Sequence, residues 1–379
     1  MDLDLSPGDL AFRDAAREWL ARHVPSEPLP SLETREGFAA HRAWEAELAA
    51  DRWSAVSWPG EYGGRGAGLV RRLLFEEEYW AARAPGRVSQ NGITLLAPTL
   101  FEHGTAEQRA RVLPPMARGE VVWAQAWSEP EAGSDLAALR SRAVRAPGGW
   151  LLSGVKTWSS RAAFADRAFG IFRTDPAAPK PHQGLTYLMF DLAAPGVTVR
   201  PIGRLDGRPA FAELSLDRVF VPDADVIGEP GRGWRIAMST TGHERGLMLR
   251  APGRYRAAAR RLVAAWRAAG SPAGVRDRVA DAVAGARAYE LFAWAEAARV
   301  AEGGAPAGRS SLNKVFWSEY DIALHETALD LLGEGAEFAD TAWAEGYVFA
   351  LAGPIYAGTN EIQRDIVAER LLGLERDRR

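Results

Sequence analysis

The segment GWLLSGVKTW (residues 149–158) marks a change in the hydrophobic pattern of this chain. It is short, contains aromatic and β-branched residues, and begins with a glycine. Three similar runs follow, separated by clusters of Gly, Pro and Asp: LTYLMFDL (185–192), VTVRPI (197–202) and AFAELSLDRVFVP (210–222). In the last run Leu214 and Leu216 alternate with polar residues, as a half-buried strand requires. These runs predict a β domain in the middle of the chain.

The sequence on both sides of these runs has helical periodicity. Apolar residues recur at helical spacing from Ser6 to about Gly119, and the same period returns after Trp234 and continues to a break near Gly333. Strands grouped between two helical regions argue against a doubly wound parallel sheet, in which strands and helices alternate. We therefore predict a mainly α-helical protein with an inserted β domain.

The composition excludes several classes of function. The chain has 379 residues, of which 47% are hydrophobic and 25% charged, so it can bury the conventional core of two or three domains. Its net charge is −3 with the two signs interspersed, which argues against a nucleic-acid partner. The absence of cysteine excludes disulfides, thiol nucleophiles and cysteine metal sites. Since the sequence shows neither a leader pattern nor 18 uninterrupted apolar residues, we expect a cytoplasmic protein without a membrane span.

Common catalytic signatures are missing from the sequence. There is no GxGxxG after a strand, no GxxxxGK[ST], no GxSxG and no HExxH. His325 and Glu326 begin a similar pattern, but Leu329 stands where the second histidine of a zinc site would be needed. We therefore predict a structural role for His325 and no metal site.

Two segments in the β region combine aromatic residues with small hydroxyls. In VVWAQAWSEPEAGSD (121–135), Pro130 and Gly133 fix a turn that is flanked by Ser128 and Ser134. On composition alone, this segment is a strand end followed by a surface turn. The downstream segment KTWSSRAAFAD (156–166) favours a functional interpretation, because together the two segments resemble the TEPxAGSD and KxWITNxxxAD motifs of the acyl-CoA dehydrogenase family.

The resemblance extends over most of the chain. FEHGTAEQRARVLPPMARGE (101–120) is similar to the family's entry into the β domain, FVPDADVIGEPGRGW (220–234) to its exit, and AGTNEIQRDIVAERLLG (357–373) to the family's C-terminal helix. The family fold implied by the resemblance agrees with the periodicity. It consists of an N-terminal helical domain (1–119), a middle β-barrel domain (120–228) and a C-terminal four-helix bundle (229–379).

The resemblance implies FAD as the cofactor and assigns residues to its site. The residues expected to line the flavin and thioester region are Gln125, Trp127, Ser128, Gly133 and Ser134. Trp158 and Ser160 would lie against the flavin ring, with Ser160 replacing the usual threonine, and Thr359 and Glu361 would approach the cofactor from the C-terminal helix. Ser134, Arg245 and Gly358 are expected to contact the thioester substrate. The local sequence also predicts that Thr359 is a helix N-cap, a role compatible with cofactor contact.

The chemistry implied by the family requires a carboxylate base, which removes an α-proton while the β-hydrogen leaves as hydride to flavin N5. Many members carry this glutamate directly before the GT of the C-terminal motif, where this chain has Ala357. A subset of the family supplies the glutamate from a bundle helix, immediately before an arginine. STTGHERGLMLR (239–250) places Glu244 before Arg245 in that way, so we predict Glu244 as the base. An ordinary helix-surface acid beside its counter-ion is the simpler alternative.

Three segments indicate a particular subset of the family. SPAGVRDRVADAVAGARAYE (271–290) lacks the RxxFG sequence that contacts a neighbouring subunit's flavin in many members, and in ALDLLGEG (328–335) Asp330 replaces a glutamine. With SSLNKVFWSE (310–319), these features look like a bacterial subset associated with sterol side-chain or unusual acyl substrates, in which some enzymes are heteromeric with one catalytically deficient subunit.

The expected partners follow from the same resemblance. They are an acyl-CoA or carrier-bound acyl thioester from fatty acid or lipid metabolism, an electron-transfer flavoprotein, and further subunits in a homodimer, tetramer or heteromer. Two alternatives keep the fold. One is a flavin-dependent oxidase or monooxygenase of the same superfamily, and the other is a non-catalytic subunit of a heteromeric acyl-CoA dehydrogenase.

Overall fold

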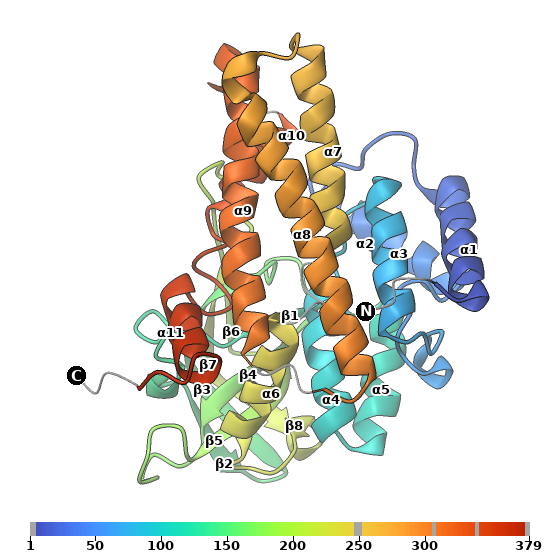
Figure 1. The fold of residues 1–379 in the computed structure, drawn as a ribbon. Helices are drawn as coiled ribbons and strands as arrows, with labels where there is room; N and C mark the ends of the chain where they lie inside the picture. Colours follow the sequence, from blue (N-terminus) through green and yellow to red (C-terminus); the bar gives the residue numbers. More distant parts are fainter. Residues whose placement is uncertain (1–4, 246–251, 305–307, 338–340, 376–379) are drawn as a thin grey trace. The chain divides into compact units, whose positions relative to one another are not determined.

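A computed structural model describes residues 5–245, 252–304, 308–337 and 341–375 of the chain (Figure 1). These residues form two compact units. The sheet unit consists of Glu27–Gly66 and Pro85–Glu244, and the bundle unit consists of Met1–Ser26, Ala67–Ala84 and Arg245–Arg379. No helix in the described ranges is long and apolar enough to cross a membrane.

The elements follow the order helices, strands, helices. The helices are α1 (Pro7–His23), α2 (Arg35–Ala50), α3 (Leu69–Ala81), α4 (Ala97–His103), α5 (Ala106–Ala117), α6 (Gly233–Arg245), α7 (Pro252–Ala268), α8 (Arg276–Ala301), α9 (Arg309–Leu332), α10 (Ala342–Ala350) and α11 (Asn360–Arg370). The strands are β1 (Trp123–Ala126), β2 (Arg142–Ala146), β3 (Gly149–Ser160), β4 (Arg167–Arg173), β5 (Leu185–Asp191), β6 (Val197–Ile202), β7 (Phe211–Pro222) and β8 (Val226–Ile227). The predicted class, a mainly helical chain with an inserted β domain, is confirmed.

The strands form one sheet with the order β6-β7-β3-β2-β4-β5-β8, and β1 pairs in parallel with β4. Along β4, Phe169 and Ile171 join one apolar cluster, while Ala168 and Phe172 join a second cluster on the opposite face. Residues of β3 and β7 also belong to the second cluster, so the sheet curls around it. In β7, the predicted alternation of buried and exposed residues is confirmed.

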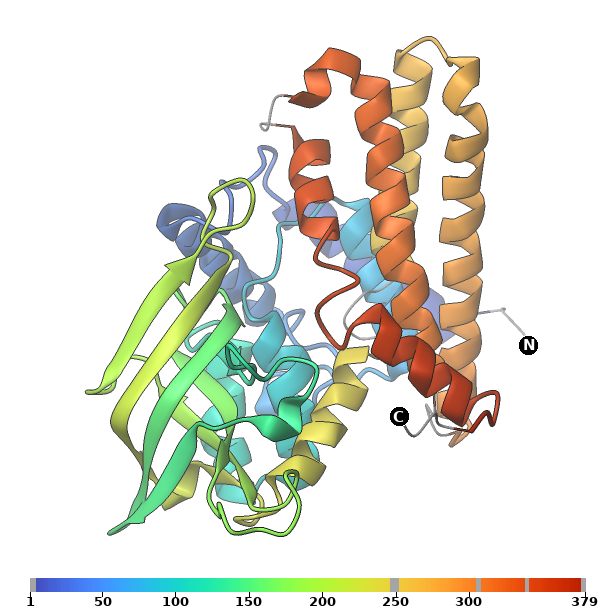
Figure 2. The same ribbon diagram turned by 90° about the vertical axis from the view of Figure 1, so that its left-hand side faces the viewer.

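Helices of the sheet unit cover the face of the sheet that carries the first cluster (Figure 2). Leu100 of α4, Leu113 of α5 and Ile236 of α6 pack into this cluster. Helix α5 begins with a capping box, in which Thr105 and Gln108 satisfy each other's backbone N–H groups. The same Gln108 side chain donates to the carbonyl of Val226 at 2.6 Å, which joins the helix to the last strand. The Gln108 contact fixes α5 relative to the sheet, and the shared apolar cluster packs α6 against the same face.

The bundle unit contains the long helices α7, α8 and α9, which pack around Leu262, Ala282 and Leu324. Helix α9 ends at Leu332, and Gly333 adopts a left-handed φ of 56°, as the sequence predicts for a helix end at this position. Helices α1 and α3 also belong to this unit, whereas α2, α4 and α5 belong to the sheet unit. The N-terminal helical region therefore contributes to both units, and the predicted domain boundaries after residues 119 and 228 stay predictions.

Candidate functional site

The first segment assigned to the site leaves strand β1 and turns back on itself. Glu129 and Ala132 exchange backbone hydrogen bonds of 3.0 and 3.1 Å across the turn. Trp127 is buried, with its ring edge-on to Tyr187 at 6.0 Å between centroids. Gln125 and Ser128 are half-buried. The core thus anchors the beginning of the segment.

The far side of the same turn is open. Gly133 and Ser134 are exposed, and a methyl group at Gly133 would meet no other atom of the described chain within 4 Å. The Ser134 hydroxyl and the neighbouring backbone are therefore accessible to a ligand. This arrangement suits a turn that binds a small molecule through hydroxyl and backbone groups.

Trp158 lies on an irregular stretch of β3. The pairing of β3 with β7 shifts register between Lys156 and Ser159, and Trp158 has a left-handed φ of 58°. This conformation is strained for a bulky residue, and such strain is typical of functional sites. The bulge leaves the Trp158 side chain 60% exposed, with the ring edge-on to Phe211 at 5.9 Å. Ser160, two residues later, is half-buried and pairs with Phe211 in the ladder.

A backbone hydrogen bond brings the two motif segments together. The N–H of Thr157 donates to the carbonyl of Ser128 at 2.8 Å. Trp158, whose indole is exposed, therefore comes directly after a residue that is hydrogen-bonded to the turn carrying Ser128 and Ser134. A flat aromatic face beside hydroxyl and backbone donors fits a planar ring system with polar edges, such as the flavin that the family resemblance implies.

A buried ion pair, which the sequence reasoning did not identify, locks this arrangement. The ammonium of Lys156 is fully buried and donates to Glu129 Oε1 at 2.9 Å, and to the carbonyls of Trp127 and Ile171 at 3.1 and 2.8 Å. The Glu129 carboxylate also accepts the backbone N–H groups of Arg140 and Ser141 at 2.6 and 2.9 Å. One salt bridge therefore holds the first motif to the second. A lysine among the apolar residues of a strand signals a buried cation in the sequence, but it does not identify Glu129 as the partner.

The pKa values of the pair follow from burial and charge. Burial lowers the pKa of Lys156 to about 8, even though Glu129 favours the charged ammonium. Burial opposes the charged form of Glu129 as well, but the Lys156 ammonium and the backbone donors outweigh it and hold the pKa of this carboxyl below its usual value. At neutral pH the pair is thus ionised on both sides.

Glu244 and Arg245, the predicted base and its neighbour, are the last two residues of α6. Their side chains lie outside the described part of the structure. The preceding turn of α6 is well anchored, because the hydroxyl of Thr240 lies 2.7 Å from that of Thr99 and donates to the carbonyl of Ile236 at 3.0 Å. The helix that carries Glu244 is therefore fixed to the sheet unit through buried hydroxyl groups.

The C-terminal segment of the predicted site belongs to the bundle unit. Ala357 and Gly358 both have left-handed φ angles, 57° and 79°, and their carbonyls accept the Gln363 side chain at 3.1 and 3.4 Å. Thr359 caps α11, as predicted, by accepting the N–H of Ile362 at 3.4 Å. The backbone of this segment is thus held in one conformation.

Two neighbours complete the N-terminus of α11. Glu361 is exposed in the first turn, and the pKa of its carboxyl lies below its usual value because its own backbone N–H and the Thr359 hydroxyl favour the charged form. Asn360 is buried and accepts from the fully buried Lys314 at 2.7 Å and from Ser318 at 3.1 Å. Lys314 lies in SSLNKVFWSE (310–319), and the sequence of this segment does not by itself predict the contact with Asn360.

The predicted site residues therefore fall into two groups. Those in the sheet unit are Gln125, Trp127, Ser128, Gly133, Ser134, Trp158, Ser160 and Glu244. Those in the bundle unit are Arg245, Gly358, Thr359 and Glu361. Within the sheet unit, the structure joins the two motif segments directly.

Two further positions singled out in the sequence have local partners. His325 is buried in the bundle, where Nδ1 lies 2.7 Å from the carbonyl of Asp321 and the ring is edge-on to Trp343. These contacts give His325 the structural role that was predicted. Asp330, which replaces the family's glutamine, forms an ion pair with Arg278. In the described residues, no group of three or more His, Asp or Glu side chains is arranged to hold a metal ion.

Comparison with known families gives matches along the whole chain. The model of the acyl-CoA dehydrogenase N-terminal domain matches residues 6–120, that of the middle domain residues 124–219, and that of the C-terminal domain residues 231–372. The acyl-CoA dehydrogenase IpdE1 of Mycolicibacterium smegmatis is 37% identical over 391 residues, which cover 97% of this chain and 98% of that protein. The acyl-CoA dehydrogenase FadE26 of Mycobacterium tuberculosis is 31% identical over 100% of both chains.

Solved structures with a similar fold include two heteromeric complexes. A chain of the ChsE4-ChsE5 complex from Mycobacterium tuberculosis is 28% identical, with a TM-score of 0.84 over 100% of both chains. A chain of the Tcur3481-Tcur3483 steroid ACAD is 27% identical, with a TM-score of 0.86 over 100% of both chains. The names of these relatives indicate an oxidoreductase that acts on acyl-CoA.

Proposed function

The chain belongs to the acyl-CoA dehydrogenase family, and we propose that it is an FAD-dependent enzyme that introduces an α,β double bond into an acyl thioester. The observation that carries the proposal is the junction of the two motifs, where Thr157 bonds to Ser128 and the strained Trp158 is exposed beside the turn. A bound FAD would supply the hydride acceptor. The buried pair of Lys156 and Glu129 keeps this junction rigid.

In this proposal, the motif residues of the sheet unit hold the flavin and orient the thioester. The Trp158 indole offers a stacking face, and Ser160 and Ser128 offer hydroxyl groups. The Ser134 hydroxyl on the open side of the turn serves the substrate and the cofactor. The backbone that carries these groups is held by the fold, so donors directed at a bound flavin would need little reorganisation during the reaction.

Glu244 is proposed to remove the α-proton of the acyl thioester. A carboxylate that a bound substrate desolvates has a raised pKa, which makes it a stronger base at neutral pH. Ala357 cannot take this role, but its backbone N–H remains a donor for the thioester oxygen as negative charge develops there. The Gln363 side chain holds the carbonyls of Ala357 and Gly358, and this contact fixes the conformation of the segment that carries that donor.

We further propose that the substrate is a lipid-derived acyl-CoA of the steroid type. The support is the likeness over the full chain to the Tcur3481-Tcur3483 steroid ACAD. A cytoplasmic enzyme that passes its electrons to an electron-transfer flavoprotein completes the proposal. The two oxygen-using alternatives, oxidase and monooxygenase, predict rapid reoxidation of the reduced flavin in air.

A second candidate is a role within a heteromer. Two of the similar solved structures are heteromeric. This chain also departs from the family pattern at Asp330, whose carboxylate forms an ion pair with Arg278. If this chain is the subunit that carries the base, loss of Glu244 abolishes turnover of the assembled enzyme. If it is a non-catalytic subunit, the same change leaves turnover unaltered.

The decisive experiment is the anaerobic absorption spectrum of the purified protein before and after addition of steroid-type and straight-chain acyl-CoA thioesters. Bleaching of a flavin band by one class identifies a dehydrogenase and its substrate class together. Glu244→Gln should slow the bleaching about 100-fold or more while the flavin stays bound, because a general base contributes at least that factor. Glu302→Gln, an exposed residue directly after α8, is the matched control and should bleach normally.

A further inference from the structure

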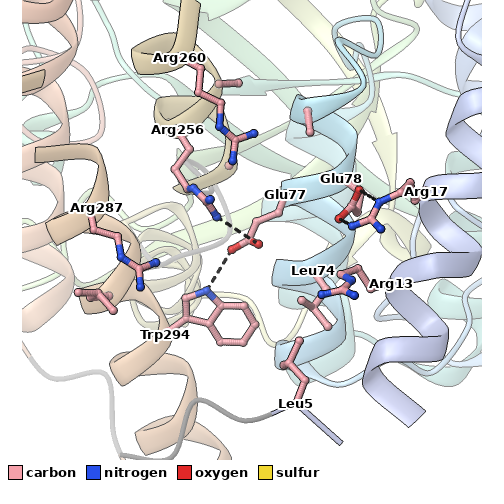
Figure 3. Close-up of a pocket in the computed structure, with 14 residues that line it drawn as sticks. Leu5, Arg13, Arg17, Leu74, Glu77, Glu78, Arg256, Arg260, Arg287 and Trp294 are labelled. Carbon is pink, nitrogen blue, oxygen red and sulfur yellow. Dashed lines mark hydrogen bonds and ion pairs between the residues drawn. The ribbon is translucent and has the colours of Figure 1, made fainter. Parts of the chain in front are cut away.

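A cavity of about 520 Å³ lies within the bundle unit, between helices α1, α3, α7 and α8 (Figure 3). Its volume is in the range of small-molecule sites. None of the residues assigned to the flavin or the thioester lines it. The cavity is therefore independent of the proposed dehydrogenase site, and the inference below does not rest on that function.

Five arginines line this cavity. They are Arg13 and Arg17 on α1, Arg256 and Arg260 on α7, and Arg287 on α8. The members of each pair on α1 and α7 are four residues apart, so they share one face of their helix, where like charges repel. Figure 3 shows the two pairs on either side of Glu77 and Glu78 of α3. Because five guanidinium groups lie around one cavity, negative charge nearby is needed to offset their mutual repulsion.

Carboxylates of the protein satisfy only part of this requirement. Glu78 binds Arg17 with two hydrogen bonds of 2.9 and 2.8 Å. The buried Glu290 is shared between Arg256 and Arg287. These three arginines are therefore fixed in the walls of the cavity.

The other two arginines keep donors available. Arg260 is exposed and makes no hydrogen bond or ion pair within the described part of the chain. Arg13 bonds only to Asp14, its own neighbour in sequence, at 3.3 Å among the described residues. Planar guanidinium groups match the oxygens of phosphate in paired hydrogen bonds. An extended anion such as a phosphate chain can use both arginines.

The same cavity offers an aromatic surface. Trp294 of α8 lines it, together with Leu74 and Leu291, and its indole N–H donates to Glu77 Oε1 at 3.0 Å, which fixes the ring. Glu77 also lies 3.8 Å from Arg256, and burial raises the pKa of its carboxyl. A fixed indole face binds a flat heterocycle by stacking. The ligand that suits the cavity therefore combines a phosphate chain with a flat ring.

We propose that this cavity binds a nucleoside polyphosphate, with the phosphate chain on Arg13 and Arg260 and the base against Trp294. The test is calorimetric titration of the FAD-loaded protein with ATP and with tripolyphosphate, at low ionic strength and without divalent metal. We expect one ATP per chain and weaker binding of tripolyphosphate. Arg260→Ala and Arg13→Ala should each weaken ATP binding about tenfold, because each removes a charge-assisted contact.

Controls separate this site from the dehydrogenase site. Arg276→Ala, an exposed arginine at the start of α8 outside the cavity, should leave ATP binding unchanged. Trp294→Leu should weaken the binding of ATP but not of tripolyphosphate. The flavin spectrum and thioester bleaching of the Arg260→Ala protein should match those of the wild type, which also shows that it folds.

Three results would overturn the proposal. The first is ATP binding that survives the combined Arg13→Ala and Arg260→Ala changes. The second is equal affinity for ATP and tripolyphosphate, which would mean that the adenine ring does not contribute to binding. The third is displacement of ATP by an enoyl-pantetheine thioester, which carries no nucleotide, because this assigns the binding to the dehydrogenase site. If no thioester bleaches the flavin, these three binding measurements can still be made. The nucleotide-binding proposal and the dehydrogenase proposal can therefore fail independently.

Discussion

Two buried lysines show how differently the sheet unit and the bundle unit hold the segments assigned to the site. The chain has three lysines among 46 basic residues, and two of them, Lys156 and Lys314, are fully buried. Lys156 in the sheet unit binds the carboxylate of Glu129 at 2.9 Å. Lys314 in the bundle unit binds the amide oxygen of Asn360 at 2.7 Å. In a chain that uses arginine almost everywhere else, lysine supplies a compact charge where space is small.

The difference between the two partners determines what each contact contributes. A buried charge pair must lose both hydration shells, so its net contribution is small while both partners are present, but removing one partner leaves an isolated buried charge. Removing the lysine from an amide partner leaves a polar group, rather than a charge, without that donor. The sheet unit should therefore depend more strongly on its lysine than the bundle unit.

The largest effect is expected for Lys156→Met. This change leaves the Glu129 carboxylate buried without its counter-ion and should lower the free energy of unfolding by about 3–5 kcal/mol. Urea denaturation followed by circular dichroism measures the loss. Lys180→Met, at the chain's exposed lysine, is the matched control and should have no effect. Adding Glu129→Leu to the Lys156→Met protein should restore part of the stability, and no recovery would contradict the isolated-charge explanation.

Lys314→Met should have a smaller effect. Asn360 keeps its hydrogen bond from Ser318 at 3.1 Å, so we expect a loss of about 1–3 kcal/mol, the cost of an incompletely satisfied buried group. The same urea titration measures it, with Lys180→Met again as the control. A loss equal to or greater than that of Lys156→Met would reverse the comparison between the units.

The contribution of the Lys156–Glu129 pair to the free energy of unfolding should decrease at acid pH. The pKa of Glu129 is lowered in the folded protein from an unfolded value of 4.5, so its contribution to stability is fully present above about pH 4.5 and is lost as the pH falls through the folded pKa. The free energy of unfolding, measured from pH 7 down to pH 3, should fall less steeply for Glu129→Gln than for the wild type. Parallel curves for the two proteins would contradict this assignment.

The architecture was predictable because it depends on local periodicity. The strand pattern around Leu214 and Leu216, the end of α9 near Gly333 and the Thr359 cap all depend on neighbours in sequence, and the structure confirms them. The family resemblance extended these local signals to the order of the three parts.

The contacts that join distant segments were not predictable in the same way. Glu129 and Lys156 both lie in motifs of the β region, but nothing in the spacing of two separate segments shows that their side chains meet in the core. The division of the N-terminal helices between two units has the same cause, because α3 packs against α7 and α8, and α1 packs against α3. The cavity between these four helices could not be predicted for that reason either.

Backbone strain offers the finest comparison between the units, because the site segments of both contain non-glycine residues with a left-handed φ: Trp158 and Arg161 in the sheet unit, and Ala357 in the bundle unit. Trp158 has a φ of 58° in the sheet unit and Ala357 a φ of 57° in the bundle unit. Ala357→Gly removes the steric cost of the left-handed conformation, which exceeds the added entropy of the unfolded chain. The free energy of unfolding should therefore rise by about 0.5–1 kcal/mol.

The glycine variants separate strain from function. Ala357→Gly keeps the backbone N–H, so thioester bleaching should persist at its normal rate. Trp158→Gly relieves similar strain but removes the exposed indole, so flavin binding or bleaching should be lost while the fold survives. If Ala357→Gly instead destabilises the protein, the left-handed conformation is not a source of strain in the bundle unit. The strain at Trp158 would then be a property of the sheet unit alone, where an aromatic face must be held outward from a strand.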